Sequence, residues 1–407
     1  MKIAYFVNEF PGFSQTFVIH QIAGMVNKGH EVDIYATVRA NAVHLIEGVV
    51  GQRCRTIYFS DLPVAYFARY ARMARRVFAS DIVRNMRLVA RVLAESASTR
   101  QALSLRLLHK ALSIERGGEY DILHCQFATL GLPVLQLKRI GALTGKVVVS
   151  VRGYDVTTAR YTDAGRYASL FENADRFLPV SESLADRLLS LGCDRQKIQV
   201  LRSGLNVDAI AQRLPRPLTT PLNLLSVGRL VEKKGLIYGL GAVAALLAQG
   251  IAVRYRIAGE GPLRDELMAA AQDLGVAEAV EMPGVCAHDR VIGLMQEADI
   301  FLAPSVTAAD GDQEGIPNVV KEAMLMGLPV ISTRHSGIPE LIEHGREGVL
   351  VAEKDSAALV EAVKQLGAMS AADLAAMCER ARAKVVRDYD EGRLNDELER
   401  IYSTLAG

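Results

Sequence analysis

The residues whose types and spacing most clearly suggest chemistry lie where a polar loop, residues 306–313, leads into a helical segment. Two glutamates, Glu314 and Glu322, stand eight positions apart across this junction. Proline is favoured at a first helical position, so a helix is predicted to begin around Pro317. Backbone N–H groups at a helix start attract anions, so we expect a diphosphate there. The amides predicted to surround it belong to Gly315, Ile316, Asn318 and Val319.

The two glutamates are expected to bind different groups. Glu322 lies about one turn inside the predicted helix, where a carboxylate suits vicinal hydroxyls such as those of ribose rather than an anion. Glu314 precedes the helix and can face a group beyond the phosphates. The alternative interpretation of Glu314 is a loop carboxylate that only caps the helix.

Two basic residues, Arg229 and Lys234, follow a predicted strand at residues 222–228. Cleavage of a sugar–diphosphate bond builds negative charge on the leaving group, and fixed cations lower that barrier. Arginine can contact a phosphate with two N–H groups, whereas lysine acts as a point charge. Either residue alone would more often be a surface charge, so the interpretation depends on the surrounding motif.

Four motifs, in the right order, resemble those of the retaining glycosyltransferases of family 4, which have the GT-B fold. They are the paired glutamates with the stretches 323–331 and 337–340, the Gly–Arg–Leu motif at 228–235, the glycine turn at 258–262, and the loop at 10–17. That loop has the form seen among exopolysaccharide-assembly members, and the resemblance covers essentially the whole chain.

This resemblance implies roles for individual residues. Arg229 and Lys234 would bind the donor diphosphate, and Glu314 would contact the donor sugar and stabilise positive charge at its anomeric carbon. The mechanism implied is front-face attack, in which the leaving phosphate accepts the proton of the acceptor.

The acceptor side is expected in the first half of the chain. Gly12 either lets the backbone approach a phosphate or only makes a turn, and Ser14 and Thr16 either face the acceptor or cap the next helix. Many relatives have His where this chain has Arg152. Arginine can bind phosphate or sugar oxygens but cannot act as a base, so no general base is assigned. Asp155 is either a hydroxyl-binding carboxylate or a helix N-cap.

Three other patterns could point to metals or cofactors but are better explained otherwise. Asp310 and Asp312 have the spacing of a metal-binding pair in another class of sugar transferase, yet they lie in a loop rather than at a strand end. The glycine pair at 259–261 lacks the third glycine of a dinucleotide site. Four histidines are not spaced as metal ligands would be, and these are His20, His124, His335 and His344. We therefore expect neither a metal nor another cofactor.

Short apolar runs alternate with helical periodicity along both halves of the chain, which is typical of right-handed βαβ units. Strands are predicted at 2–8, 31–37, 121–126, 146–152, 176–181 and 198–202, and then at 222–228, 253–258, 279–283, 299–304, 329–333 and 348–352. The expected fold class is α/β, with two tandem Rossmann-like doubly wound parallel-sheet domains facing a cleft.

The length of 407 residues also favours two domains. A Pro-rich stretch at 213–221 is the best linker candidate. The predicted units are an acceptor-side domain over 1–203, a donor domain over 204–385, and a C-terminal helix over 386–407. The family's fold implies that this helix crosses back to the first domain.

The composition is that of an ordinary globular protein, with 50% hydrophobic and 23% charged residues, and it excludes a disordered or disulfide-stapled chain. Five scattered cysteines fit a reducing compartment. The first eight residues indicate a buried strand rather than a signal peptide, and the uncharged run at 236–253 indicates a helix and then a strand rather than a membrane span. We therefore expect a cytoplasmic protein.

The net charge of +1 conceals a local excess of basic residues between Tyr66 and Lys110. This segment has ten basic residues against two acidic ones, interleaved with large apolar residues in a cationic amphipathic pattern. The pattern fits either an anionic surface, such as the inner face of the cytoplasmic membrane, or a solvated helical insertion. Nucleic acid is disfavoured because no base-reading motif accompanies the charge.

The sequence thus predicts a retaining hexosyltransferase that moves a sugar from a nucleoside-diphosphate sugar, with UDP favoured, to a glycan or polyprenyl-linked saccharide in cell-surface polysaccharide biosynthesis. A GDP-mannose-dependent mannosyltransferase is the nearest alternative. An epimerase of the same fold would turn over its donor without an acceptor. A catalytically silent binding protein would be favoured by loss of Arg229, Lys234 or Glu314, and all three are present.

Overall fold

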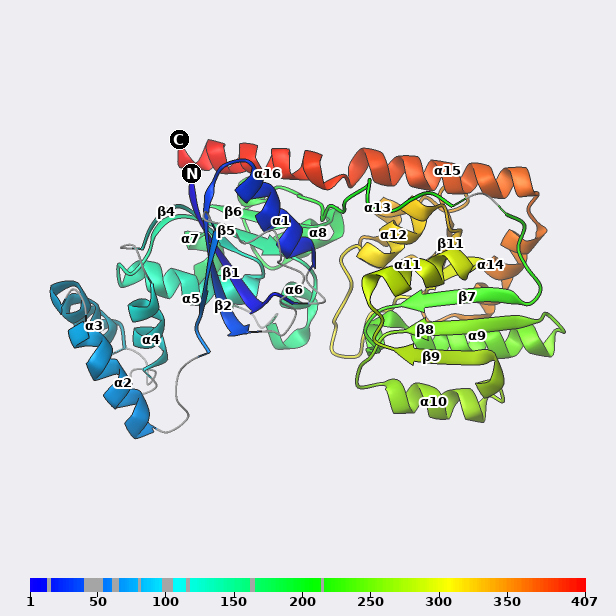
Figure 1. Cartoon of the computed structure of the whole chain (residues 1–407), viewed down its shortest axis with the longest axis horizontal. Coiled ribbons are helices and arrows are strands. Elements are labelled where there is room, and N and C mark those ends of the chain that lie inside the picture. The colour runs from blue at the N-terminus through cyan, green and yellow to red at the C-terminus, as the bar shows by residue number, and fades with distance from the viewer. Residues whose placement is uncertain are drawn as a thin grey trace.

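Two α/β domains lie side by side, each built on a six-stranded parallel sheet (Figure 1). A computed structural model describes residues 1–12, 16–39, 54–60, 66–79, 82–96, 105–114, 118–161, 165–213 and 216–407. The strand orders are β3-β2-β1-β4-β5-β6 and β12-β11-β10-β7-β8-β9. Read from β3 in the first sheet and from β9 in the second, both have the doubly wound order 3-2-1-4-5-6 of a Rossmann domain. The predicted fold class is confirmed.

The N-terminal sheet contains β1 (Lys2–Phe10), β2 (Glu31–Arg39), β3 (Cys54–Tyr58), β4 (Glu119–Cys125), β5 (Thr144–Val151) and β6 (Arg176–Pro179). Its helices are α1 (Thr16–Asn27), α2 (Tyr66–Ala79), α3 (Ile82–Ser96), α4 (Arg106–Ser113), α5 (Ala128–Arg139), α6 (Tyr154–Thr157), α7 (Ala168–Asn173) and α8 (Glu182–Ser190). The apolar run of β1 is buried from Ile3 to Val7 because helices cover both faces of the sheet.

The C-terminal sheet contains β7 (Leu222–Val227), β8 (Val253–Ala258), β9 (Val280–Gly284), β10 (Ile300–Ala303), β11 (Val330–Thr333) and β12 (Val349–Val351). Its helices are α9 (Leu236–Ala248), α10 (Arg264–Asp273), α11 (His288–Glu297), α12 (Asn318–Met326), α13 (Ile338–Leu341), α14 (Ser356–Ala368) and α15 (Ala371–Asp388). The final helix is α16 (Glu391–Ala406).

Eleven of the twelve predicted strands are present, and one prediction is wrong. The stretch 198–202 is not a strand, because Ile198 makes only an isolated bridge to Phe177. The sixth strand of the first sheet is instead β3, a five-residue strand at the sheet edge that pairs with β2. The uncharged run at 236–253 folds as α9 followed by a loop and the start of β8. No helix in the described residues has the length and apolarity needed to cross a membrane.

The chain passes between the domains at two adjacent places. After β6 it enters the second domain near Leu205, and it returns between α15 and α16 (Figure 1). These two crossings are bonded to each other, because Leu205 N–H donates to Tyr389 O at 3.0 Å and Glu391 N–H donates to Leu205 O at 3.1 Å. Helix α16 packs against α1 of the first domain, and the Tyr402 hydroxyl lies 3.0 Å from that of Tyr5.

Candidate active site

The carboxylate of Glu314 lies between two lysines, near the end of the 304–317 loop that joins β10 to α12. Its Oε1 is 3.2 Å from Lys234 Nζ and 3.6 Å from Lys233 Nζ. Burial alone would raise the pKa of this carboxyl, but the two lysines outweigh burial and hold it at about 2. Glu314 is therefore a carboxylate at any physiological pH.

The backbone of Glu314 is fixed by a buried histidine. Its N–H donates to Nε2 of His335 at 3.1 Å. The ring proton must then be on Nδ1, which donates to Oε1 of Glu353 at 2.7 Å. The other oxygen of Glu353 accepts the Thr307 N–H at 2.7 Å, so both ends of the loop are tied to one carboxylate–histidine pair. His335 is fully buried.

Lys233 fixes the middle of the same loop, and the sequence motif did not single it out. Its Nζ donates to Asp312 Oδ1 at 3.0 Å and to Gln313 O at 3.3 Å, and the side chain is only 8% exposed. Asp310 is also engaged, because its Oδ1 accepts the Asp312 N–H at 2.9 Å. The Asp310–Asp312 pair thus has a structural use, and the described residues contain no cluster of three His, Cys, Asp or Glu side chains placed for a metal.

The start of α12 presents unpaired amides next to Lys234. The helix begins at Asn318, and Pro317 is the N-cap residue with ψ 127° rather than the first helical residue. In the described part of the chain, no hydrogen bond is donated by the four amides predicted to bind the anion, which are those of Gly315, Ile316, Asn318 and Val319. A depression beside them is lined by Gly228, Lys234, Pro317 and Val319. Free amides at a helix start, next to a lysine, are an arrangement that can bind an anion.

The loop that carries Arg229 is braced by the glycine turn at 258–262. Gly228 N–H donates to Ala258 O and Leu230 N–H donates to Glu260 O, both at 2.9 Å. A Cβ on Gly259, whose φ is 147°, would lie 1.8 Å from Gly228 O, so this close backbone contact requires glycine. The Arg229 side chain is exposed and makes no hydrogen bond or ion pair with a described residue.

Glu322 lies one helical turn inside α12 and faces the first domain. Burial raises the pKa of its carboxyl, although His288, Lys321 and His20 oppose that shift. Among the described residues, no side-chain partner accepts or donates a hydrogen bond to it. The hydroxyl-binding role expected of Glu322 from the sequence stays a prediction.

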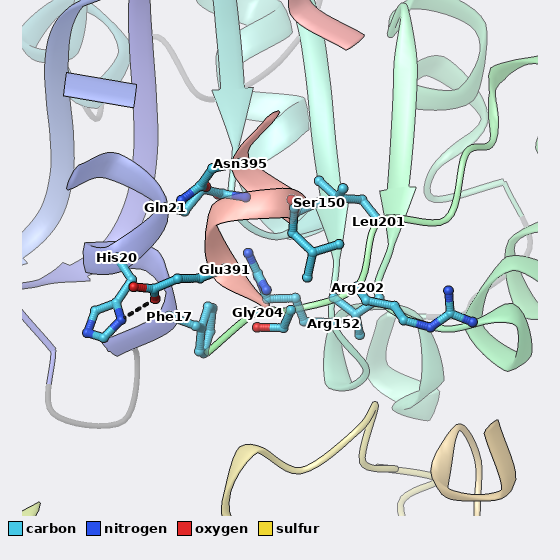
Figure 2. A pocket seen from close by; sticks show the side chains of 13 residues that line it. Phe17, His20, Gln21, Ser150, Arg152, Leu201, Arg202, Gly204, Glu391 and Asn395 are labelled. Atoms are coloured by element: carbon cyan, nitrogen blue, oxygen red, sulfur yellow. Dashed lines mark hydrogen bonds and ion pairs between the residues drawn. The ribbon is translucent and has the colours of Figure 1, made fainter. Parts of the chain in front are cut away.

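Arg152 is the most unusual residue on the acceptor side. Its guanidinium lies over the Phe17 ring, 4.1 Å from the centroid, and Nη2 donates to Gln126 Oε1. Its Nε is buried without a partner in the described structure. Burial lowers the pKa of this group to about 10, and Asp155 and Tyr5 only partly offset it. Figure 2 shows Arg152 in a pocket that is also lined by Phe17 of α1, by residues 201–204 and by the start of α16.

Asp155 has neither of the roles expected from the sequence. Its Oδ1 accepts N–H groups from Arg152 at 3.1 Å and Gly153 at 3.0 Å, and its Oδ2 accepts the Ala128 N–H at 2.8 Å. The side chain is fully buried, and the N-cap residue of α6 is Gly153. Asp155 therefore cannot bind an acceptor hydroxyl, and it instead ties the Arg152 loop to the start of α5.

The N-terminal loop is described only in part. Gly12 is buried after β1, and Thr16 is the first residue of α1. Ser14 lies outside the described residues, as does the side chain of Thr16. The predicted roles of both side chains remain predictions.

The two domains touch at the site itself. Ala159 N–H donates to Asp310 O at 2.8 Å, and Gln313 N–H donates to Thr157 Oγ1 at 3.2 Å. A Cβ on Gly315 would lie 2.7 Å from Val180 Cγ2 of the first domain. The structure therefore brings Glu314, Lys234 and the start of α12 together with the Arg152 loop, and leaves the Arg229 side chain exposed at the surface.

Two doubly wound parallel-sheet domains that meet at the start of α12 have the arrangement of the GT-B fold of glycosyltransferases. Residues 221–368 match the family model described as "Glycosyl transferases group 1", and residues 14–204 match "Glycosyl transferase 4-like domain". The chain belongs to this family of glycosyltransferases.

Full-length relatives agree with that assignment. WcaL of Escherichia coli, named for colanic acid biosynthesis, is 34% identical over 409 residues, and the match covers 100% of both chains. AmsK of Erwinia amylovora, named as an amylovoran biosynthesis glycosyltransferase, is 33% identical with the same coverage.

Solved structures share the fold. HepE of Anabaena, solved with UDP and glucose, has a TM-score of 0.73 at 16% identity and covers 99% of this chain and 100% of its own. Sucrose-phosphate synthase of Thermosynechococcus elongatus has a TM-score of 0.72 at 17% identity, over 100% and 99% of the two chains.

Proposed function

We propose that this protein is a retaining hexosyltransferase that uses a nucleoside-diphosphate sugar and elongates a saccharide in exopolysaccharide biosynthesis. The observation that carries the proposal is the start of α12, where four amides donate no hydrogen bond to a described residue. Lys234 and Val319 line a depression at this helix start, and Lys234 also contacts Glu314. A diphosphate fits these donors, and a sugar attached to it would extend toward Glu314. The names of WcaL and AmsK support the biosynthetic assignment.

UDP is the favoured nucleotide. HepE has the same fold and was solved with UDP and with UDP-glucose, which supports a uridine donor. A GDP-mannose donor is the alternative, because the residues that bind the base are not identified by the motif. The unpartnered Glu322 would hold the ribose hydroxyls in either case.

The proposed reaction proceeds on one face of the donor sugar. The amides of α12, with Arg229 and Lys234, stabilise the negative charge that develops on the leaving diphosphate, so these cations do the work that a metal ion does elsewhere. Glu314 remains ionised and stabilises positive charge at the anomeric carbon. Arg152 cannot serve as a base, so the leaving phosphate accepts the proton of the acceptor hydroxyl.

The acceptor is proposed to be a glycan or a polyprenyl-linked saccharide that binds beside Arg152 in the first domain. We place the reaction on the cytoplasmic side of the membrane. The five free cysteines fit a reducing compartment, and three of them are buried.

A thermal-shift panel of nucleotides, followed by turnover assays, tests this function. UDP-sugars should raise the midpoint of unfolding, and Lys234→Ala should remove most of that shift while Arg254→Ala, an exposed change in the same domain, keeps it. Donor turnover should require an acceptor, and the product should keep the anomeric configuration of the donor. A shift with adenine nucleotides alone, or turnover that ignores the acceptor as in an epimerase, would refute the proposal.

A further inference from the structure

Helices α2 and α3 expose an unusual number of large apolar side chains. Of the fourteen large hydrophobic residues that are exposed in the described structure, six lie in these two helices. They are Tyr70, Phe78, Ile82, Val83, Met86 and Leu93, which we call the α2–α3 patch. Phe78, Val83 and Leu93 are each at least 60% exposed. Such a concentration on one element marks an interaction surface rather than the scatter normal on a protein.

The patch is separate from the apolar face that holds these helices on the domain. Met73 and Val77 of α2, with Leu88 and Val92 of α3, are at most 6% exposed. Asn85 joins the helices by donating to Val77 O at 3.1 Å. The apolar pattern of the segment therefore has two faces, and among the described residues only the inner face is buried against the domain.

The outer residues form continuous stripes along both helices. On α3, Ile82, Met86 and Leu93 are exposed at helical spacing, with Ala90 completing the row. On α2, Tyr70 and Phe78 are eight residues apart, which places them two turns apart on one face. A stripe of this kind can lie flat on an apolar boundary.

Arginines flank the stripes. Arg75 and Arg87 are exposed and make no hydrogen bond or ion pair with a described residue. The whole segment from Tyr66 to Lys110 has ten basic residues against two acidic ones. An apolar stripe with cationic flanks is complementary to an interface that is apolar inside and anionic at its surface, which is the headgroup boundary of an acidic bilayer.

The α2–α3 patch lies away from the second domain, so docking through it would leave the candidate active site accessible. Figure 1 shows α2 and α3 at the end of the first domain, away from the second domain. Arg76 Nη1 donates to Ser113 Oγ at 2.8 Å and thereby ties α2 to α4, which is packed into the core of the first domain. Contact through the patch would thus hold the acceptor-side domain and leave the donor domain to move.

We propose that α2 and α3 dock this protein on an anionic bilayer, with Phe78, Ile82 and Leu93 inserted at the headgroup boundary and Arg75 and Arg87 against lipid phosphates. The proposal stands independently of the transfer reaction, because it concerns a different surface and a different ligand.

Vesicle flotation of the full chain tests the docking. Vesicles of phosphatidylcholine are compared with vesicles that also contain phosphatidylglycerol, at low and high salt. The protein should float with the anionic vesicles only, and high salt should release part of it. Phe78→Ser with Leu93→Ser should lower the partition coefficient by about tenfold or more. Val285→Ser with Leu274→Ser, also exposed but in the second domain, should leave it unchanged.

The charge is tested by a second matched pair. Arg87→Glu should weaken flotation, whereas Arg254→Glu, an exposed change on β8, should not. The thermal shift given by the nucleotide checks that each variant is folded, so a failure of docking is distinguished from a failure of the proposed function. Absence of flotation with anionic vesicles would overturn the proposal, as would equal flotation of the Phe78→Ser, Leu93→Ser variant. Dimerisation of the wild type that this double change abolishes would assign the patch to a second copy instead.

Discussion

At the scale of single residues, Glu314 has the most tightly controlled environment in the site. Two lysines hold its carboxylate, and a buried histidine holds its backbone. With a pKa of about 2, this group cannot donate a proton near neutral pH, so its contribution must be electrostatic or positional. Because Glu314 stays ionised above about pH 5, its titration should not change the activity there.

Glu314→Gln removes the negative charge and keeps the size of the side chain. We expect kcat to fall by about a hundredfold or more, because charge stabilisation at the reacting centre is lost. Donor affinity should change by only a few-fold, since the amides of α12 and Lys234 remain. Steady-state kinetics measures both kcat and the donor affinity. The matched control is Glu343→Gln, which changes an exposed carboxylate in the same domain. Near-normal transfer by a folded Glu314→Gln protein would show that the role is wrong.

His335 should act through Glu314 rather than on the substrate. His335→Leu leaves the Glu314 N–H and the Glu353 carboxylate without their partner, which costs about 1–3 kcal/mol for a buried donor. We expect kcat to fall by about tenfold or more while donor affinity stays within a few-fold. His335→Gln, which keeps an acceptor at the reach of Nε2, should recover part of the rate. Equal losses of kcat and of donor affinity in both variants would indicate general misfolding.

At the scale of elements, Gly315 controls how closely α12 and its loop approach the first domain. A Cβ there would lie 2.7 Å from Val180 Cγ2 and 3.1 Å from Arg152 O. Gly315→Ala should therefore hold the domains apart, lowering kcat by about tenfold with little loss of nucleotide affinity. Gly367→Ala on α14, where a Cβ meets no atom within 4 Å, is the control. Kinetics and nucleotide thermal shifts report the two effects, and unchanged transfer would contradict the packing argument.

The elements that sequence predicts well are those with a local pattern. Continuous apolar strands such as β1 and β10 were predicted to within a few residues because burial on both faces leaves a clear signal. The sequence does not predict strand β3, because this short edge strand has one buried residue and four half-buried ones rather than a continuous apolar run. The stretch 198–202 has the apolar pattern but no neighbour with which to form a ladder.

The candidate site divides in the same way. The glutamates and the helix start were predicted from spacing along one segment. Lys233, His335 and Glu353 were not, because their contacts with the loop join positions up to 80 residues apart, and no local spacing encodes such contacts. The contacts of Asp155 are not predicted for a related reason. Its Oδ2 accepts the Ala128 N–H, and this contact depends on how α5 packs.

At the scale of the whole molecule, the two chain crossings near Leu205 and Tyr389 are bonded to each other, and we call this place the hinge. Lys321 joins α12 to this hinge by donating to Ser203 O, and its Nζ lies 5.1 Å from the Tyr389 ring centroid. The side chain is fully buried. Helix α12, which we propose binds the donor, is thus connected directly to the place where the chain crosses between the domains.

Lys321 also makes the hinge sensitive to pH. Burial lowers its pKa to about 7, Glu322 opposes that shift, and Arg152 adds to it. In the unfolded chain the pKa is about 10.4, so the folded state binds this proton less tightly. Burial of the charged lysine lowers the free energy of unfolding by its full amount below about pH 7, and this loss is relieved as pH rises toward about 10.

Lys321→Met removes the titration, so the variant's stability relative to the wild type should fall by about 3 kcal/mol over that range. Chemical denaturation at several pH values measures the difference, with Lys364→Met, an exposed lysine on α14, as the control whose difference stays constant. A constant difference for Lys321→Met as well would mean that the hinge lysine is already solvated in the folded state.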